Sequence, residues 1–312
     1  MREFLVSTND AGQRLDRFLA KAVPALPGTL AQKSIRTKRI KVNGKRTEQS
    51  YRLVEGDTIQ LYINDEFFEA DGADEPFRGI ADPNLRICYE DEHLLIVDKP
   101  PGTLCHSGNT PGEITLVDQV KAYLYQSGAW DPAQEQSFVP ALCNRLDRNT
   151  GGLVLAAKTA AALQELNEKI RDREVDKYYL LAVHGEPNPP EGRIEGHLIK
   201  DHANNRVALV HAEVADSKDA VTEYRTLETK GALSLVECKL ITGRTHQIRA
   251  QMAAIGCPLL GDHKYGGHGD QPYQALWAYR VCFRFASDAG VLGYLHGQEF
   301  VSREIPSWRN VF

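Results

Sequence analysis

The residue in this sequence that is best placed for catalysis is an aspartate, Asp147, with arginines close to it on both sides. Asp147 lies between Arg145 and Arg148 in the stretch Asn-Arg-Leu-Asp-Arg-Asn-Thr-Gly-Gly at residues 144–152. An opposite charge within a few ångströms keeps a carboxylate ionised where burial alone would protonate it. An ionised aspartate held in this way can act as a nucleophile. A charge-balanced surface turn without a catalytic role would show the same pattern, so both interpretations stay open.

The residues that follow Asp147 predict the elements that would hold it in place. The turn Thr-Gly-Gly at 150–152 lets the backbone approach a ligand closely, and the apolar run 153–157 suits a buried strand. Apolar residues then recur at helical spacing over 160–172, after Thr159, which is suited to cap the helix. Asp147 is therefore expected on a loop braced by a sheet.

A second candidate lies far along the chain at Arg244. The segment 248–255 has a helical apolar stripe that ends at Gly256 and Pro258. Arg244 thus precedes a helix N terminus, a region of positive potential that suits an anionic partner. An ordinary arginine near a helix cap would look the same.

Length and composition favour a cytoplasmic protein of two domains. A chain of 312 residues, 42% hydrophobic and 25% charged, can build one large and one small core. Its N terminus lacks a targeting signal, and its apolar runs are far too short to span a bilayer. The six cysteines occur singly, and His197, His202 and His211 match no ligand motif. We therefore expect reduced thiols, no metal and no membrane partner.

Charge is distributed unevenly along the chain. The formal net charge is −5, yet residues 1–63 carry twelve Lys and Arg against six Asp and Glu, whereas 64–82 carry one against seven. A basic patch follows in the first segment: Lys33, Arg36, Lys38, Arg39, Lys41, Lys45 and Arg46. A basic helix that continues into a basic hairpin can face phosphates, although a charge run is also common on a solvated face. The acidic segment predicts a flexible linker over 64–84.

The stretch around Asp147 resembles the signature of the RluA-type pseudouridine synthases. That family reads His-Arg-Leu-Asp-x-x-Thr-Ser-Gly, followed by an apolar strand and Ala-Lys-Thr, and Asp147 falls on its catalytic aspartate. Asn144 stands where histidine is common, and Gly151 stands where serine is common. Neither departure removes a group that the chemistry requires.

Two further segments match the same family. Residues 91–102 resemble its opening motif, Asp-Glu-x-(apolar)4-x-Lys-Pro-x-Gly, which a histidine follows. We expect Lys99 and His106 to have structural roles near the site. The family's Lys-x-Tyr-Leu pattern selects Tyr179 over Tyr178 as the active-site tyrosine.

The segment around Arg244, Thr-Gly-Arg-Thr-His-Gln-Ile-Arg, is the other strong match, so the resemblance implies roles for four side chains. Asp147 would be catalytic, Arg244 would pair with it and keep it ionised, and Tyr179 would stack on the uracil and assist removal of the carbon 5 proton. Because the target base must be flipped out of a helix, Arg145 would fill the vacated stack. The reaction detaches uracil through nitrogen 1 and reattaches it through carbon 5, which requires no cofactor.

The N-terminal segment resembles the S-four type RNA-binding domain, through Ile-Lys-Val-Asn-Gly at 40–44 and Gly-Asp-x-Ile at 56–59. The implied fold is α+β, with this domain at 1–63, a linker at 64–84, and a catalytic domain at 85–312 around a mixed, largely antiparallel β-sheet. The implied activity is that of an RNA pseudouridine synthase. We expect a monomer that acts on large-subunit ribosomal RNA, with transfer RNA as the alternative.

Two rival functions remain. A non-catalytic RNA-binding or ribosome-assembly protein could keep this fold, and Asn144 and Gly151 are the features that favour it. A glycoside hydrolase also uses an aspartate at an anomeric carbon, but it requires a second carboxylate, and none is evident in the matched motifs.

Overall fold

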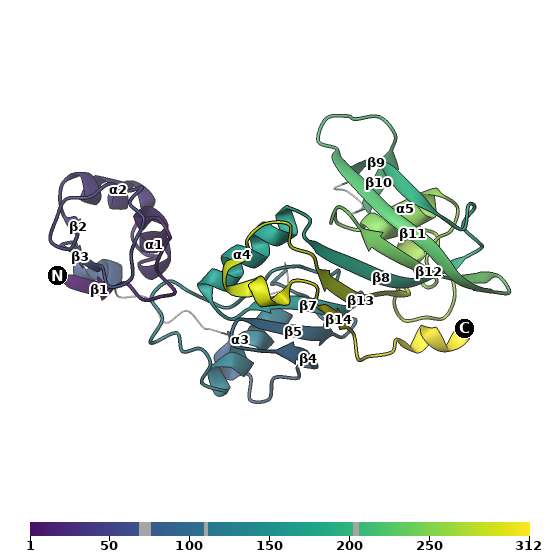
Figure 1. Cartoon of the computed structure of the whole chain (residues 1–312), viewed down its shortest axis with the longest axis horizontal. Coiled ribbons are helices and arrows are strands. Elements are labelled where there is room, and N and C mark those ends of the chain that lie inside the picture. Colours follow the sequence, from purple (N-terminus) through teal and green to yellow (C-terminus); the bar gives the residue numbers. More distant parts are fainter. Residues whose placement is uncertain (69–75, 109–111, 202–205) are drawn as a thin grey trace.

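The computed structural model describes residues 1–68, 76–108, 112–201 and 206–312 (Figure 1). Within these ranges the strands form two sheets, one of three strands near the N terminus and one of eleven strands in the rest of the chain. Figure 1 shows the small N-terminal unit at one end of an elongated molecule, with the large sheet extending away from it. No helix in the described part is long and apolar enough to cross a membrane.

The N-terminal unit packs two helices on an antiparallel sheet of order β1-β3-β2. Its elements are β1 (Arg2–Leu5), α1 (Leu15–Ala22), α2 (Gly28–Arg36), β2 (Ile40–Val42) and β3 (Thr58–Leu61). Leu15, Phe18 and Leu19 recur at helical spacing and are at most 1% exposed. They share a core with Ile59 and Leu61 of the central strand, so this unit has a core of its own.

The two described ends of the acidic segment 64–84, which composition predicts to be a linker, each pack against a neighbouring core. Phe67 and Phe68, in the 3-10 helix η1 (Asp65–Phe68), pack against the N-terminal core. Phe77, in η2 (Pro76–Gly79), is 3% exposed, and its ring centroid lies 5.3 Å from that of Trp130. Apolar side chains therefore attach both ends of the segment to the neighbouring cores, while residues 69–75 lie outside the described part.

The large sheet is mixed and largely antiparallel, which confirms the expected fold class. Its strands are β4 (Ile87–Glu90), β5 (Leu94–Lys99), β6 (Ala141–Leu142), β7 (Gly151–Ala157), β8 (Val175–His184), β9 (Glu191–Asp201), β10 (Arg206–Val210), β11 (Lys218–Lys230), β12 (Leu233–Leu240), β13 (Leu276–Phe283) and β14 (Glu299–Val301). The order is β10-β9-β11-β12-β8-β13-β7-β5-β4, with β14 beside β13 and β6 beside β7. Among the described strands, β7 and β13 form the one parallel pair.

Short helices pack around this sheet and brace the loop before β7. They are α3 (Leu116–Gln126), α4 (Ala160–Arg171), α5 (Gln247–Ala254), η3 (His263–Tyr265), η4 (Gly290–Leu295) and η5 (Ser307–Val311). Thr159 caps α4 as predicted, because its Oγ1 accepts the Ala162 amide at 3.2 Å. Every residue of β7 is buried, with alternate side chains in the cores on its two faces. The Asp147 loop is thus continuous with a fully buried strand.

Polar groups join the N-terminal unit to the larger one near α4. Gln13 Nε2 donates to Ser137 Oγ at 2.6 Å, and Ser137 donates to Asp10, which is fully buried. Asn9 Nδ2 donates to Glu135 at 2.7 Å, and Asn9 Oδ1 accepts the first amide of α4 at 3.1 Å. These bonds hold the two units together at a defined contact.

Candidate active site

A cavity of about 530 Å³ opens beside the loop that carries Asp147. Its walls come from the loop 143–150, from the end of α4 and the start of β8 (170–179), and from the segment 240–249 that leads into α5. Among the described residues that line it, Asp147 is the only carboxylate, whereas six are lysine or arginine. Such a cavity attracts an anionic ligand.

Asp147 is held from the side of α5. Its Oδ2 accepts a hydrogen bond from Arg249 Nη1 at 3.3 Å and lies 3.7 Å from His246 Nε2. Asp262 orients Arg249 in turn, because its carboxylate accepts from Nε at 2.6 Å and from Nη2 at 2.8 Å. The Asp147 side chain is 22% exposed. It is therefore fixed by a buried arginine yet still accessible from the cavity.

The prediction that Arg244 forms an ion pair with Asp147 is wrong. Arg244 lines the cavity but is exposed, and its Nε donates to the carbonyl oxygen of Asp219 at 3.0 Å. As expected, Arg244 precedes α5, and His246, with a φ of 54°, is the last residue before the helix. The partner of Asp147 is instead the second arginine of the segment, Arg249, which donates to it from the first turn of the helix.

The two arginines that flank Asp147 in the sequence do not pair with it either. Arg145 and Arg148 are exposed, and Arg148 Nη2 donates instead to Glu113 at 3.0 Å. Arg145 lines the rim of the cavity, and its role in filling a vacated base stack stays a prediction. The charge that steadies Asp147 comes from far along the chain.

Tyr179 lies on the cavity side of β8. It is 6% exposed, and burial, together with the charge of Asp147, raises the pKa of its phenol. Successive strand residues point to opposite faces, and on the other face Tyr178 packs under the Arg280 guanidinium, 3.9 Å from its ring centroid. The structure thus places Tyr179 in the cavity as a neutral phenol, with an aromatic ring suited to stack on a base.

His246 is a cavity residue that the sequence analysis did not single out. Its Nδ1 lies 2.9 Å from the hydroxyl of Tyr265, and the two rings pack edge to face. Burial lowers the pKa of His246, against the opposing charge of Asp147. A neutral imidazole leaves Arg249 as the charged partner of the carboxylate. The sequence feature that could have identified His246 and Arg249 was their position in the matched segment Arg-Thr-His-Gln-Ile-Arg at 244–249.

Lys99 connects the bend after β5 to the loop that carries Asp147. It is fully buried, and its Nζ donates to the carbonyl oxygens of Pro100, Thr103 and Arg148 at 2.9–3.0 Å. Burial lowers the pKa of Lys99 to about 8. Its bond to Arg148 positions the residue next to Asp147, which is the structural role expected from the sequence. His106 is exposed and does not line the cavity.

Cys143 lines the cavity but is poorly suited to act as a second nucleophile. Burial raises the pKa of its thiol to about 12, so the reactive thiolate is scarce at neutral pH. Asp147 remains the stronger candidate.

The two departures from the family signature each have a structural explanation. Asn144 Oδ1 accepts a hydrogen bond from the Leu155 amide at 2.8 Å, and Asn144 Nδ2 donates to the carbonyl oxygen of Leu153, so the side chain holds the Asp147 loop against β7. A Cβ at Gly151 would lie 2.1 Å from a ring atom of Trp277. The indole that packs against Gly151 therefore requires glycine at this position.

The basic patch lies on α2, β2 and their flanks in the N-terminal unit. Six of its seven residues are exposed, and Lys41 is partly covered by Tyr62, with its Nζ 5.2 Å from the ring centroid. A shallow groove of about 470 Å³ brings Lys33, Arg36 and Arg46 together. None of the seven forms an ion pair with a described residue.

No metal centre is found in the part of the chain that the structure describes: no three or more His, Cys, Asp or Glu side chains gather to hold an ion. His197 instead pairs with Asp219 at 3.1 Å. His211 is exposed, and His202 lies outside the described residues.

Comparison with known families agrees with this arrangement. The model of the RNA pseudouridylate synthase family matches residues 93–254, and that of the S4 domain matches residues 13–59. The first match covers more than half of the chain, so the chain belongs to the RNA pseudouridylate synthase family. It is an RNA pseudouridine synthase, an isomerase, with an S4 domain at its N-terminal end.

Individual relatives extend along nearly the whole chain. An uncharacterized RNA pseudouridine synthase of Bacillus subtilis, YlyB, is 30% identical over 97% of this chain and 93% of its own length. Ribosomal large subunit pseudouridine synthase C of Vibrio cholerae is 30% identical over 89% of this chain and 84% of its own. The solved structure of human RNA pseudouridylate synthase domain containing 4 shares the fold, with a TM-score of 0.56 and 21% identity over 72% of this chain and 89% of that one.

Proposed function

We propose that this enzyme converts uridine to pseudouridine in large-subunit ribosomal RNA, with Asp147 as the catalytic residue. The observation that carries the assignment of Asp147 is its position as the sole carboxylate among the described residues of a cavity lined by six cationic side chains. Relatives from Vibrio cholerae and Escherichia coli that are named for the large ribosomal subunit support the choice of RNA.

In this proposal the carboxylate of Asp147 acts on the flipped-out nucleotide while the hydrogen bond from Arg249 holds that carboxylate in place. The bond between nitrogen 1 and the sugar breaks, the base turns, and a bond from carbon 5 to the same sugar carbon forms. Carbon 5 loses a proton and nitrogen 1 gains one, so the product is an isomer and no cofactor is consumed. Tyr179 is held as a neutral phenol, which suits stacking and a relay of this proton through its hydroxyl.

Mapping pseudouridines in cells tests both the substrate and the catalytic residue. RNA from cells that lack the protein should lose pseudouridine at one or more positions of large-subunit ribosomal RNA. The wild-type gene should restore these positions, and Asp147→Ala should not, although both proteins accumulate equally. Positions lost only from transfer RNA would replace the proposed substrate, and full restoration by Asp147→Ala would remove Asp147 from the chemistry.

A further inference from the structure

Lys177 is a cation in the cavity that the proposed chemistry does not use. It lies on β8 two residues before Tyr179, so both side chains point to the same face of the strand. Lys177 is partly buried, and burial lowers its pKa. Its Nζ forms no hydrogen bond or ion pair with any residue that the structure describes. The nearby charge of Asp176 offsets only part of the cost of desolvating the ammonium, so Lys177 is suited to bind an anionic ligand.

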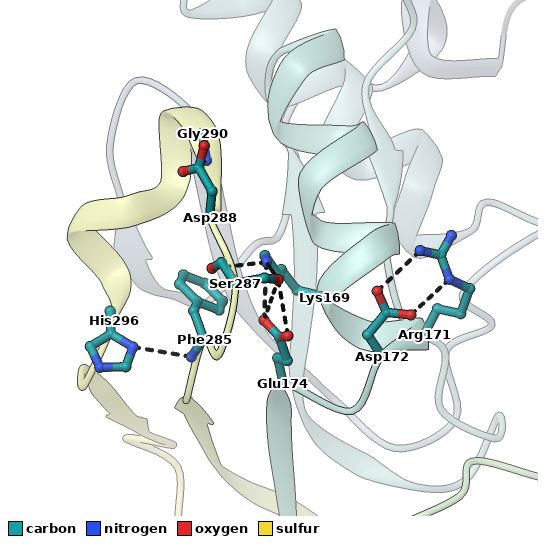
Figure 2. Close-up of polar contacts among 9 residues, drawn as sticks. All are labelled: Lys169, Arg171, Asp172, Glu174, Phe285, Ser287, Asp288, Gly290 and His296. Atoms are coloured by element: carbon teal, nitrogen blue, oxygen red, sulfur yellow. Dashed lines mark hydrogen bonds and ion pairs between the residues drawn. The ribbon is translucent and has the colours of Figure 1, made fainter.

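Two other lysines near β8, Lys169 and Lys239, each form an ion pair with an acid. Lys169 at the end of α4 is fully buried, and its Nζ lies 3.0 Å from Glu174 and 3.1 Å from the carbonyl oxygen of Ser287. Figure 2 shows these contacts. On the far face of β8, Asp176 pairs with Lys239 at 2.9 Å. The acid next to Lys177 in the sequence is therefore used elsewhere.

The cavity wall around Lys177 carries further unpaired positive charge. Arg173 lies in the turn between α4 and β8 with a φ of 63°, and its side chain lines the cavity without an ion pair to a described residue. The bonds of Lys169 to Glu174 and of Arg171 to Asp172 flank this turn and hold it (Figure 2). Arg173 and Lys177 thus form a basic arm of the cavity on a supported backbone.

We propose that Lys177, assisted by Arg173, binds one RNA phosphate next to the uridine that is held at Asp147. This inference rests on the proposed function, since it assumes that the uracil stacks on Tyr179. Two residues along a strand span about 7 Å, a distance similar to that between a base and its own phosphate. A phosphate has the charge and the acceptor oxygens to satisfy an ammonium and a guanidinium together.

The stability of Lys177→Gln separates this role from a structural one. Removal of an unpaired, partly buried charge should leave the melting temperature unchanged or raise it. RNA binding should nevertheless weaken by roughly ten- to a hundredfold, as for the loss of a charge-assisted hydrogen bond. Lys177→Arg keeps the charge and should retain most of the affinity.

The decisive experiment removes phosphate charges one at a time. The probe is the shortest stem-loop that contains the uridine found by mapping, with a single neutral methylphosphonate at each position within two nucleotides of that uridine. Wild-type enzyme should lose affinity most strongly at one position. Lys177→Gln should be indifferent to that substitution and respond normally to the others. Lys230→Gln, at an exposed lysine away from the cavity, should keep the wild-type profile.

Identical profiles for wild-type enzyme and Lys177→Gln would overturn the proposal, as would a Lys177→Gln protein that melts markedly earlier. Conversion of the unmodified stem-loop by wild-type enzyme reports separately on the proposed function. An enzyme that leaves its uridine unchanged would contradict that function, whereas an active enzyme with no position specific to Lys177 would contradict only the phosphate contact.

Discussion

The basic patch of the N-terminal unit and the cavity beside Asp147 use cations in opposite ways. The seven patch residues lie at the surface, and none pairs with an acid in the described part of the chain. In the cavity, Arg249 is only 8% exposed and is bonded to two carboxylates, Asp147 and Asp262. Surface charges are screened and replaceable, whereas each buried partner depends on the other. Substitutions should therefore have graded effects in the patch and severe ones in the cavity.

The largest effect is expected at Asp147. Asp147→Asn should reduce pseudouridine formation by at least about a thousandfold, because no other carboxylate among the described residues lines the cavity. Folding should be retained, since Arg249 keeps its bonds to Asp262. Single-turnover assays and thermal melting of the purified variant measure both outcomes. Turnover near the wild-type rate would show that the acid is not catalytic.

Arg249 and Arg244 provide a matched pair next in magnitude. Arg249→Met leaves Asp262, whose side chain is 1% exposed, without its partner and should destabilise the fold by about 3–5 kcal/mol. Arg244→Met removes an exposed side chain and should leave the unfolding free energy unchanged while weakening RNA binding. Urea unfolding of both variants makes the comparison. Equal stability losses would contradict the division of roles between the two arginines.

Tyr179→Phe keeps the ring and removes the hydroxyl. Product formation should fall on the order of a hundredfold, as for the loss of a proton-transfer group, while the affinity for RNA changes little. Tyr178→Phe is the control, because that ring lies on the other face of β8 against Arg280. Rates and dissociation constants measured on one stem-loop separate the two effects. A larger defect in Tyr178→Phe would place the active tyrosine one residue earlier.

The patch should respond in proportion to the charge removed. Replacing Lys33, Arg36 and Arg46 by glutamine should lower the salt slope of RNA binding by about two, at about 0.7 per single-strand phosphate contact. Turnover on a saturating stem-loop should stay close to wild type. These substitutions are cleaner than deletion of residues 1–63, because deletion would expose the polar contacts of Ser137. An unchanged slope would mean that the patch does not anchor RNA.

The smallest effect is expected from chelation. The described residues contain no cluster suited to hold a metal ion, so turnover should survive prolonged treatment with a chelator. The assay should use a short stem-loop whose folding is checked separately, since RNA itself requires cations. Loss of activity that one particular divalent ion restores would contradict this expectation.

Local sequence patterns predicted the secondary structure around the site well. They failed to predict side-chain partners that are determined by contacts between distant parts of the chain. The buried strand after Asp147 and the Thr159 cap follow from neighbouring residues, so the sequence alone was sufficient for both. The sequence placed Arg244 correctly before α5, but which of the two arginines reaches Asp147 is decided by contacts between distant segments: Arg249 bonds to Asp147 and Asp262, whereas Arg244 bonds to Asp219. The acidic composition of the 64–84 segment also gave no indication that Phe77 would be buried.

The contact between Gly151 and Trp277 has a consequence for how this chain can change. The family commonly places serine at the position of Gly151, but a side chain there would collide with the indole, since its Cβ would lie 2.1 Å from a ring atom. Gly151→Ser by itself should therefore be harmful, and the same change should be tolerated after Trp277 has been replaced by a smaller residue. The two positions are epistatic, and an evolutionary route to the common signature must pass through the tryptophan first.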